Sequence, residues 1–384
     1  MKKALVVGGG NGIGLAVVHE LLAQGYDMVS VVDRDGSHLP ETEKVSFTKF
    51  DLRSRDFSVF DAYEDINALY ITAGFGRLAF FEELKEAEII NNLRVNAEAV
   101  IRILHRFYHK LLAGEPFYCG VMGSIVGIVN SPLFSAYSAS KAAICSCMDA
   151  LNTELAYHGS ENRILNASPG NIKGTCFDGA AQTDLSAVQA FAAEFIRRSE
   201  NRELLYIPSY DEVYADVIRR SREDVQAFGL SSIEYKQKSG RLDTPTKPQL
   251  KVGYLSGTFD LFHVGHLNLL KRAKQYCDYL VVGVHADASH KGKKVYIPLE
   301  ERKAIVESIS YVDQVIDSCK EDVDVYKNGI VKYDFLFVGS DYEGTPRFKS
   351  YEEYFSDKGV KIVYFPYTQG RSSTQLREEI ANDK

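Results

Sequence analysis

Short apolar runs alternate with stretches of helical periodicity through the first part of the chain. Within the stretches that separate the runs, apolar residues recur every three or four positions. The predicted strands are 4–7, 28–32, 45–50, 68–72, 117–122 and 163–167, and the predicted helices are 12–24, much of 80–112, and 136–158. Strands that alternate with helices predict a parallel sheet covered by helices on both faces.

The alternation is interrupted and then begins again. Residues 176–239 have a largely helical pattern, and the polar stretch that follows, with a glycine and two prolines, predicts a linker at 241–250. Beyond it, the predicted strands are 252–255, 279–284, 313–316, 335–338 and 361–365, and the predicted helices are 264–275, 299–309 and 373–381. We therefore predict an α/β protein with two Rossmann-like parallel-sheet domains. The larger, doubly wound domain covers 1–240 and the smaller covers 251–384.

Composition narrows the class of protein. The 384 residues are 45% hydrophobic and 25% charged, which is ordinary for globular domains. The net charge of -7 argues against a nucleic-acid binder. No apolar run approaches the ~18 residues of a membrane span, and the run after Met1-Lys2-Lys3 is too short for a signal peptide. The six cysteines form no C-x-x-C pair, which favours reduced thiols and a cytoplasmic location.

A glycine cluster follows the first predicted strand and opens the first helix. Gly8, Gly12 and Gly14 let the backbone turn tightly and approach a pyrophosphate, and the helix N-terminus offers N–H groups to phosphates. Asp33 ends the second strand about 20 residues later, where a carboxylate can bind the adenosine ribose and repel a 2′-phosphate. This favours NADH over NADPH. Arg34 could instead pair with a 2′-phosphate, and Asp33 could be a loop cap.

A tyrosine and a lysine lie four residues apart on the helix predicted at 136–158. Tyr137 and Lys141 therefore share one helix face. A nearby ammonium is expected to lower the pKa of the phenol, which could then exchange a proton near neutral pH. Ser124, after the preceding strand, could hold a carbonyl oxygen. The same spacing also occurs on solvated helix faces.

Taken in order, these features resemble the short-chain dehydrogenase/reductase family over residues 1–240. The resemblance implies that Tyr137 is the general acid/base, Ser124 polarises the carbonyl, Lys141 binds the nicotinamide ribose and Asn96 orders a relay water. The implied NAD(P)H-binding residues are Gly8, Gly12, Ile13, Gly14, Asp33, Asp51, Leu52, Ala73, Gly74, Tyr137, Lys141, Pro169, Gly170, Ile172 and Thr175. Thr72 departs from the family's usual asparagine, and 178–239 carries no clear family signature.

A second nucleotide-handling signature, Gly257-Thr258-Phe259-Asp260-Leu261-Phe262-His263-Val264-Gly265-His266, follows the strand predicted at 252–255. His263 and His266 are three apart at a helix start and share a face. Two imidazoles and free helix N–H groups can stabilise charge on a polyphosphate. A metal pair and two unrelated structural histidines are the alternatives. Without a third ligand at a suitable spacing we predict no metal held by the protein alone.

The segment 251–384 resembles the cytidylyltransferases that activate glycerol phosphate, phosphocholine and phosphoethanolamine. The resemblance implies CTP as a substrate, with Mg²⁺ held largely by phosphate oxygens. His263, His266, Lys291 and Lys293 are the implied catalytic residues. The implied nucleotide-binding residues are Gly257, Thr258, Phe259, His263, Gly265, His266, Lys294, Asp341, Arg371, Ser372, Ser373 and Thr374. Two of the family's usual arginines are Ser310 and Tyr367 here, and Arg371 could replace one of them.

The two signatures together predict a bifunctional enzyme. A reductase would convert a keto-sugar phosphate to a polyol phosphate, and a cytidylyltransferase would convert that product to a CDP-polyol for a surface polysaccharide or teichoic-type polymer. The alternatives are an adenylyltransferase, a transferase with a non-catalytic first domain, and a nucleotide sensor. The family resemblances also imply a homo-oligomer, a dimer or tetramer. No nucleic acid and no membrane span are expected.

Overall fold

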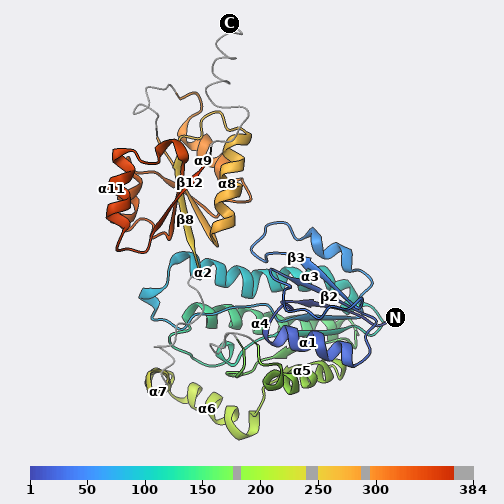
Figure 1. Ribbon diagram of the computed structural model, residues 1–384. Helices are drawn as coiled ribbons and strands as arrows, with labels where there is room; N and C mark the ends of the chain where they lie inside the picture. The colour runs from blue at the N-terminus through green and yellow to red at the C-terminus, as the bar shows by residue number, and fades with distance from the viewer. Residues whose placement is uncertain (176–182, 239–249, 287–294, 367–384) are drawn as a thin grey trace. The chain divides into compact units, whose positions relative to one another are not determined.

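A computed structural model describes residues 1–175, 183–238, 250–286 and 295–366 (Figure 1). By its contacts the chain divides into unit 1, Met1–Lys247, and unit 2, Pro248–Lys384. The predicted sites at Lys291, Lys293, Lys294 and 371–374 lie outside the described residues. Among the described residues, no helix is both long enough and apolar enough to span a membrane.

Unit 1 contains a parallel seven-stranded sheet. Its strands are β1 (Lys3–Val7), β2 (Met28–Asp33), β3 (Val45–Lys49), β4 (Ala68–Ile71), β5 (Tyr118–Met122), β6 (Ile164–Ala167) and β7 (Leu205–Tyr206). The strand order is β3-β2-β1-β4-β5-β6-β7, and every pairing is parallel. The chain therefore reverses direction across the sheet between β1 and β4, the type of position at which doubly wound folds bind ligands.

Alternate residues of the central strands supply two hydrophobic layers. Leu5 and Val7 of β1 pack with α3 and α4, whereas Ala4 and Val6 pack with α1 and α5. All four side chains have zero exposed area, which explains why β1 is continuously apolar rather than alternating. The helices of unit 1 are α1 (Gly12–Ala23), α2 (Glu86–Leu93), α3 (Ala99–Leu112), α4 (Ser135–Tyr157), α5 (Leu185–Glu200), α6 (Ala215–Glu223) and α7 (Val225–Lys238).

The long helical segment predicted within 80–112 is broken into several elements. A short 3₁₀ turn, η2 (Phe81–Glu83), precedes α2, and a π turn, η3 (Arg94–Glu98), joins α2 to α3. Such a single π turn shifts the phase of the helix and is frequent at functional sites. Between 183 and 238, the short strand β7 was not predicted, because two residues are too few to give a period.

Unit 2 contains a smaller parallel sheet in the order β10-β9-β8-β11-β12. Its strands are β8 (Val252–Gly257), β9 (Tyr279–Val284), β10 (Gln314–Asp317), β11 (Phe335–Gly339) and β12 (Lys361–Phe365). Its helices are α8 (Val264–Tyr276), α9 (Leu299–Glu307), α10 (Asp322–Lys327) and α11 (Pro346–Phe355). Figure 1 shows α8 and α11 on opposite sides of this sheet. The predicted fold class, two parallel-sheet α/β domains, is confirmed.

Helices α10 and α11 were missed by the sequence analysis, although α11 had a readable signal. Thr345 caps α11 by accepting a hydrogen bond from the Phe348 nitrogen, and Pro346 occupies its first turn. Phe348, Tyr351 and Phe355 recur at helical spacing and are buried. These are the start signal and the apolar stripe of an amphipathic helix. The predicted helix at 373–381 lies outside the described residues.

Candidate active sites

The C-terminal ends of the central strands bring the predicted residues of unit 1 together. Gly8 follows β1, Ala73 and Gly74 follow β4, Ser124 follows β5, and Pro169 follows β6. These strands are neighbours in the sheet, and the point at which strand order reverses lies between β1 and β4. The predicted cofactor-binding segments therefore share one edge of the sheet, where doubly wound folds take dinucleotides.

The glycine loop is packed too closely for other residues. An added Cβ on Gly8 would lie 2.4 Å from the Ala73 nitrogen, and one on Gly14 would lie 2.1 Å from the Gly8 carbonyl oxygen. Gly8 and Gly12 also have positive φ angles of 89° and 57°, which glycine adopts without strain. Helix α1 begins at Gly12, and the partly buried Ile13 packs on the core behind it. This cradle fits the pyrophosphate of a dinucleotide.

The two acidic residues predicted on the adenosine side, Asp33 and Asp51, accept hydrogen bonds from nearby backbone nitrogens. Asp33 accepts hydrogen bonds from the Gly10 nitrogen at 2.8 Å and the Arg34 nitrogen at 2.6 Å, as a loop cap does. Asp51 accepts bonds from Nε and Nη2 of the Arg53 side chain and one from its backbone nitrogen. Burial raises the pKa of Asp51, but the bonds from Arg53 outweigh it, and the pKa is lowered overall. The neighbouring Leu52 packs against the core.

Lys141 and Asn96 meet beside Gly74. An added Cβ on Gly74 would lie 3.1 Å from Asn96 Oδ1 and 3.5 Å from Lys141 Nζ, so the missing side chain leaves a space bounded by both groups. Lys141 Nζ donates to the Met122 carbonyl at 2.6 Å. Asn96 is fully buried in the π turn and donates to the Phe75 carbonyl at 2.7 Å and to Ser140 Oγ at 3.1 Å. The π turn thus places the Asn96 amide beside Gly74, which Lys141 also borders.

Tyr137 lies in the first turns of α4 and is hydrogen-bonded to Ser124. Burial raises the pKa of Tyr137 to about 12, and the bond from Ser124 offsets only part of this effect. Burial also lowers the pKa of Lys141 to about 8. The expected lowering of the phenol pKa by Lys141 is therefore not found. The ammonium lies 5.8 Å from the phenol ring centroid and is committed to the Met122 carbonyl.

The predicted nicotinamide-side turn follows β6. Its Pro169 carbonyl accepts a hydrogen bond from the Ile125 nitrogen at 3.0 Å, directly after Ser124. Thr175 is buried and donates to the Ile172 carbonyl at 3.1 Å. Gly170 is covered by Tyr214, whose phenol oxygen would lie 1.6 Å from an added Cβ. This turn is therefore tied both to the predicted catalytic serine and to the segment that follows β7.

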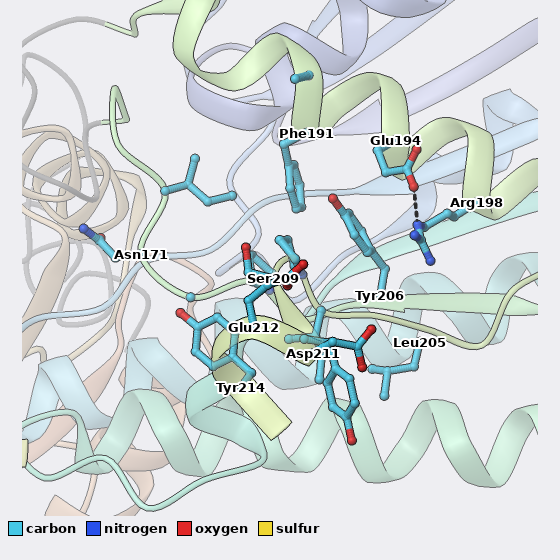
Figure 2. A pocket seen from close by; sticks show the side chains of 17 residues that line it. Asn171, Phe191, Glu194, Arg198, Leu205, Tyr206, Ser209, Asp211, Glu212 and Tyr214 are labelled. Atoms are coloured by element: carbon cyan, nitrogen blue, oxygen red, sulfur yellow. Dashed lines mark hydrogen bonds and ion pairs between the residues drawn. The ribbon is translucent and has the colours of Figure 1, made fainter. Parts of the chain in front are cut away.

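A pocket of about 940 Å³ lies against the same turn (Figure 2). Pro169, Gly170 and Ile172 form one wall, and residues of α5 and of the segment after β7 form the others. Figure 2 shows Phe191 and Tyr206 directed into the pocket and the Glu194–Arg198 ion pair at its edge. The cavity is in the size range of small-molecule sites and adjoins the predicted reductase site.

The segment 209–238, for which the sequence indicated no role, covers the surroundings of Tyr137. Ile233 of α7 packs on a cluster that contains Leu133, Phe134 and Tyr137. The buried Lys236 donates to Ser131 Oγ at 2.9 Å and to the Pro132 carbonyl at 2.6 Å. This segment therefore packs beside Tyr137, the predicted general acid/base. Its apolar spacing was too weak to predict that contact, which joins residues about 100 positions apart.

In unit 2, β8 delivers the second signature to the start of α8. His263 is the N-cap of α8, and its Nδ1 accepts a hydrogen bond from the Gly265 nitrogen at 3.0 Å. His266 Nδ1 accepts from the His263 nitrogen at 3.4 Å. The two rings stack with centroids 4.1 Å apart. Because both Nδ1 atoms accept, each neutral ring carries its proton on Nε2, which can donate to a phosphate oxygen.

The loop before α8 is held in an unusual conformation. Phe259 and Leu261 have positive φ angles of 52° and 49°, which cost energy in residues with side chains. Asp260 is buried and accepts bonds from the Tyr296 and Ile297 nitrogens at 3.1 and 3.0 Å. These two hydrogen bonds hold the loop in this conformation. Such stored strain is typical of functional loops.

Arg302 of α9 is a second anchor of this loop. Its guanidinium donates to the carbonyls of Thr258, His285 and Ala286 at 2.5 to 2.8 Å, and its side chain is almost fully buried. Arg302 was not among the predicted site residues. The sequence feature that could have drawn attention to Arg302 is its position directly after the acidic residues Glu300 and Glu301 in the first turn of α9.

Burial favours the neutral form of both imidazoles of the second site. Burial lowers the pKa of His263. Burial, then the neighbouring His263, lowers the pKa of His266 to about 4, although Asp260 opposes this. A neutral pair donates from Nε2 without needing a proton from solvent. Among the described residues, no group of three or more His, Cys, Asp or Glu side chains is placed to hold a metal.

The lowered pKa of His266 predicts how the stability of unit 2 depends on pH. His266 is neutral in the folded state but gains a proton below about pH 6.5 when unfolded, so stability falls as pH decreases from 6.5 to 4. We expect a loss on the order of 2 kcal/mol. The measurement is calorimetric unfolding at pH 7, 6 and 5 of the unaltered chain and of His266→Asn. The variant should show a shallower dependence, and equal slopes would contradict the prediction.

One further predicted nucleotide contact, Asp341, follows the strand that pairs with β8 on the side away from β9. Asp341 follows β11, and its carboxylate would lie 2.4 Å from an added Cβ on Gly339. Gly257 ends β8, where an added Cβ would lie 2.9 Å from the Phe259 ring. Tyr367 lies outside the described residues, as do Arg371, Ser372, Ser373 and Thr374. Asp341 and the histidines therefore belong to neighbouring strands, β11 and β8.

Known proteins match both halves of the chain. Residues 2–185 match the short chain dehydrogenase family, and residues 254–379 match the family described as cytidylyltransferase-like. The glycerol-3-phosphate cytidylyltransferase of Bacillus subtilis (strain 168) is 43% identical over 129 residues, which are 33% of this chain and 93% of that enzyme. The enzyme of the same name from Staphylococcus aureus (strain NCTC 8325 / PS 47) is 38% identical over 130 residues, 32% of this chain and 90% of its own length.

The chain belongs to the cytidylyltransferase family. Its N-terminal region is a short-chain dehydrogenase/reductase domain, so the predicted resemblances to both families are confirmed, and the chain is an oxidoreductase fused to a nucleotidyltransferase. A solved short chain dehydrogenase/reductase from Burkholderia phymatum, in complex with NAD, is 18% identical with a TM-score of 0.49. That match covers 59% of this chain and 94% of the other.

Proposed function

We propose that this chain reduces a keto-sugar phosphate with NAD(P)H to a polyol phosphate and then transfers CMP from CTP to that product. The products of the second step are a CDP-polyol and pyrophosphate. One observation carries the proposal. Tyr137 with Lys141, and His263 with His266, each stand near the start of a helix at the C-terminal edge of their own parallel sheet, in one chain.

The reductase step is supported by the arrangement around Tyr137. The nicotinamide supplies a hydride to the carbonyl carbon. The phenol, with a pKa of about 12, is protonated at neutral pH and can donate to the carbonyl oxygen as charge develops there. Ser124, bonded to the same phenol, holds that oxygen. Lys141 and Asn96 border the space beside Gly74, where Lys141 would bind the ribose and Asn96 would order a water for proton return.

The transferase step is an in-line displacement at phosphorus. An oxygen of the acceptor phosphate forms a bond to the α-phosphorus of CTP, and the bond to pyrophosphate breaks. His263 and His266 donate from Nε2 to phosphate oxygens, and the N-terminus of α8 adds backbone N–H groups. Mg²⁺ would bind mainly to phosphate oxygens and water. Lys291, Lys293 and Lys294 are proposed to add positive charge.

The names of the relatives support the second substrate class. Both are glycerol-3-phosphate cytidylyltransferases, and glycerol phosphate is the smallest polyol phosphate. Reduction of a ketose phosphate yields a compound of the same class, with a phosphate and several hydroxyl groups. The reductase domain would thus supply the acceptor that the transferase domain consumes. We propose surface polysaccharide or teichoic-type polymer synthesis as the use of the CDP-polyol.

The test supplies the full chain with Mg²⁺, CTP, NADH or NADPH, and a panel of ketose phosphates. Nicotinamide oxidation and pyrophosphate release are followed together. We expect pyrophosphate only when ketose phosphate, reduced nicotinamide and CTP are all present. If preformed polyol phosphates are cytidylylated but no ketose phosphate is reduced, the first domain is non-catalytic or unrelated in function. Replacing CTP with ATP separates a cytidylyltransferase from an adenylyltransferase.

Asp33 is expected to set the preference for NADH. The carboxylate stands at the end of β2 and would repel a 2′-phosphate, so Asp33→Ser should lower kcat/KM for NADH about 10-fold and raise it for NADPH. Initial rates with each nucleotide measure both effects. Asp35→Ser, which alters an exposed carboxylate bonded to Ser37, is the control and should change neither. A preference for NADPH in the unaltered chain would contradict the prediction.

We also propose that the protein is a cytoplasmic homo-oligomer, a dimer or tetramer. Short-chain dehydrogenases and cytidylyltransferases share this property by the resemblance noted from the sequence. Light scattering of the purified chain measures the mass, which is 43.0 kDa for one copy. A mass of one copy at micromolar concentration would contradict it.

A further inference from the structure

Helices α10 and α11 begin at the edge of unit 2 that carries the second signature. α10 begins at Asp322 after β10, and α11 begins at Pro346 after β11, just as α8 begins at Val264 after β8. Figure 1 shows α8 and α11 on opposite sides of the sheet. An in-line displacement needs the acceptor and the leaving pyrophosphate on opposite sides of the α-phosphorus. Because α8 is proposed to bind the phosphates of CTP, we expect the acceptor on the side of α11.

An ion pair joins the starts of α10 and α11. Arg347 lies in the first turn of α11, and its Nε is 2.8 Å from Oε2 of Glu321, the N-cap of α10. Its Nη2 lies 4.0 Å from Oδ2 of Asp322. Asp322 accepts a hydrogen bond from Ser256 Oγ at 2.5 Å, and Ser256 directly precedes Gly257, the first residue of the second signature. Two contacts therefore link the guanidinium to the strand end that delivers the signature.

A buried tyrosine holds this ion pair in one orientation. Tyr351 is 4% exposed, and its hydroxyl donates a hydrogen bond to Glu321 Oε2. Arg347 Nε donates to the same hydroxyl oxygen at 3.2 Å, and the guanidinium carbon lies 5.5 Å from the centroid of the Tyr351 ring. Ion pairs at protein surfaces usually contribute little, because two long side chains must be ordered to form them. Here the fold supplies that order, as a pre-organised binding group requires.

The ion pair leaves a donor edge and an acceptor oxygen open to solvent. Nη1 and Nη2 of Arg347 and Oε1 of Glu321 form no hydrogen bond with another described residue, and the two side chains are 37% and 36% exposed. A phosphate group bound here would meet two acidic side chains, those of Glu321 and Asp322, beside the single guanidinium. A hydroxyl group is neutral and can both accept and donate. Two neighbouring hydroxyl groups therefore match this pair better than a phosphate does.

We propose that Arg347 and Glu321 are specificity-determining residues of the transferase site and bind two neighbouring hydroxyl groups of the acceptor polyol phosphate. The Nη groups of Arg347 donate to the hydroxyl oxygens, and Oε1 of Glu321 accepts a hydroxyl hydrogen. Tyr351 is a positioning residue that acts through both. An acceptor without hydroxyl groups makes none of these hydrogen bonds. The inference rests on the proposed cytidylyltransferase function and adds which part of the acceptor is recognised.

The experiment measures pyrophosphate release from the full chain, with Mg²⁺, CTP and the best acceptor among glycerol 3-phosphate and the phosphates of ribitol, arabinitol and a hexitol. Arg347→Ala should raise KM for the acceptor about 10- to 100-fold, with less than about a 3-fold change in KM for CTP. Glu321→Gln, which keeps an acceptor oxygen, should lose less than Glu321→Ala. Lys358→Ala, which removes a surface ion pair with Asp357, is the matched control and should change neither KM.

Propyl phosphate separates hydroxyl recognition from phosphate recognition, because it carries a phosphate and no hydroxyl group on its chain. As a competitor of the acceptor, it should inhibit the unaltered chain and Arg347→Ala with the same inhibition constant. If the variant binds propyl phosphate more weakly by the same factor as the acceptor, Arg347 binds the phosphate and this assignment is overturned. Equal shifts in the KM values for CTP and acceptor, or an unchanged acceptor KM, would also overturn this assignment alone. No pyrophosphate release from the unaltered chain would overturn the proposed transferase function and this assignment with it.

Discussion

Tyr137→Phe is expected to lower the rate of ketose phosphate reduction by about 10²- to 10⁴-fold. The substitution removes the only atom of that side chain that can pass a proton to the carbonyl oxygen. The ring is buried in an apolar cluster with Leu133 and Phe134, so phenylalanine should pack without loss of structure. The measurement is nicotinamide oxidation with saturating ketose phosphate, together with pyrophosphate release from CTP and a preformed polyol phosphate, which should not change.

The same helix offers a matched control. Tyr157 ends α4 and is 88% exposed, so Tyr157→Phe removes an equivalent hydroxyl far from the predicted chemistry and should leave both activities intact. If Tyr137→Phe keeps full reductase activity, the first domain does not use this tyrosine as an acid. If the variant loses both activities, the substitution has damaged the whole chain rather than one site.

Much of the fold was predictable because each element that carries the sheets has a strong local pattern. Residues 4–7 of β1 and the whole of β9 are continuous apolar runs with fully or almost fully buried side chains, and Gly8 and Gly14 after β1 stand where the backbone has no space for a Cβ. Parallel strands and their crossover helices follow from such alternation alone. Of the elements that were missed, β7 and α10 are two and six residues long, which is too short to establish a period, whereas α11 has ten residues and a readable start signal.

The candidate site was predictable where chemistry depends on spacing along one helix. Tyr137 and Lys141 are four residues apart, and His263 and His266 are three residues apart. In each pair, the helix geometry alone fixes the relative position of the two residues. Contacts between distant segments were not predictable. Lys236 donates hydrogen bonds to Ser131 and Pro132. No local sequence pattern predicts a contact between residues about 100 positions apart.

The electrostatics of the reductase site also needed the structure. The sequence places an ammonium near the phenol of Tyr137, and proximity alone predicts a lowered phenol pKa. In the fold, burial of both groups dominates: it raises the pKa of Tyr137 and lowers that of Lys141. Desolvation depends on everything packed around a group. It therefore cannot be derived from the spacing of two residues.

His266→Asn is expected to lower kcat for CMP transfer by about 10²- to 10³-fold. His266 Nδ1 is used to accept from the His263 nitrogen, so the proton that can reach a phosphate oxygen is on Nε2. The asparagine amide reaches only the position of Nδ1, whereas the glutamine amide reaches that of Nε2. His266→Gln should therefore keep more activity than His266→Asn.

Comparing the asparagine and glutamine variants distinguishes the loss of the hydrogen-bond donor at Nε2 from the loss of ring packing. The ring of His266 lies 4.1 Å from that of His263 and 5.3 Å from that of Phe259, and either amide loses these contacts. If lost packing were the cause, both variants would fail equally, and the donor role would be contradicted. Nicotinamide oxidation by both variants should equal that of the unaltered chain, because Tyr137 and Lys141 belong to a different unit. With ketose phosphate, NAD(P)H and CTP together, His266→Asn should then accumulate polyol phosphate, whereas Tyr137→Phe should accumulate neither product.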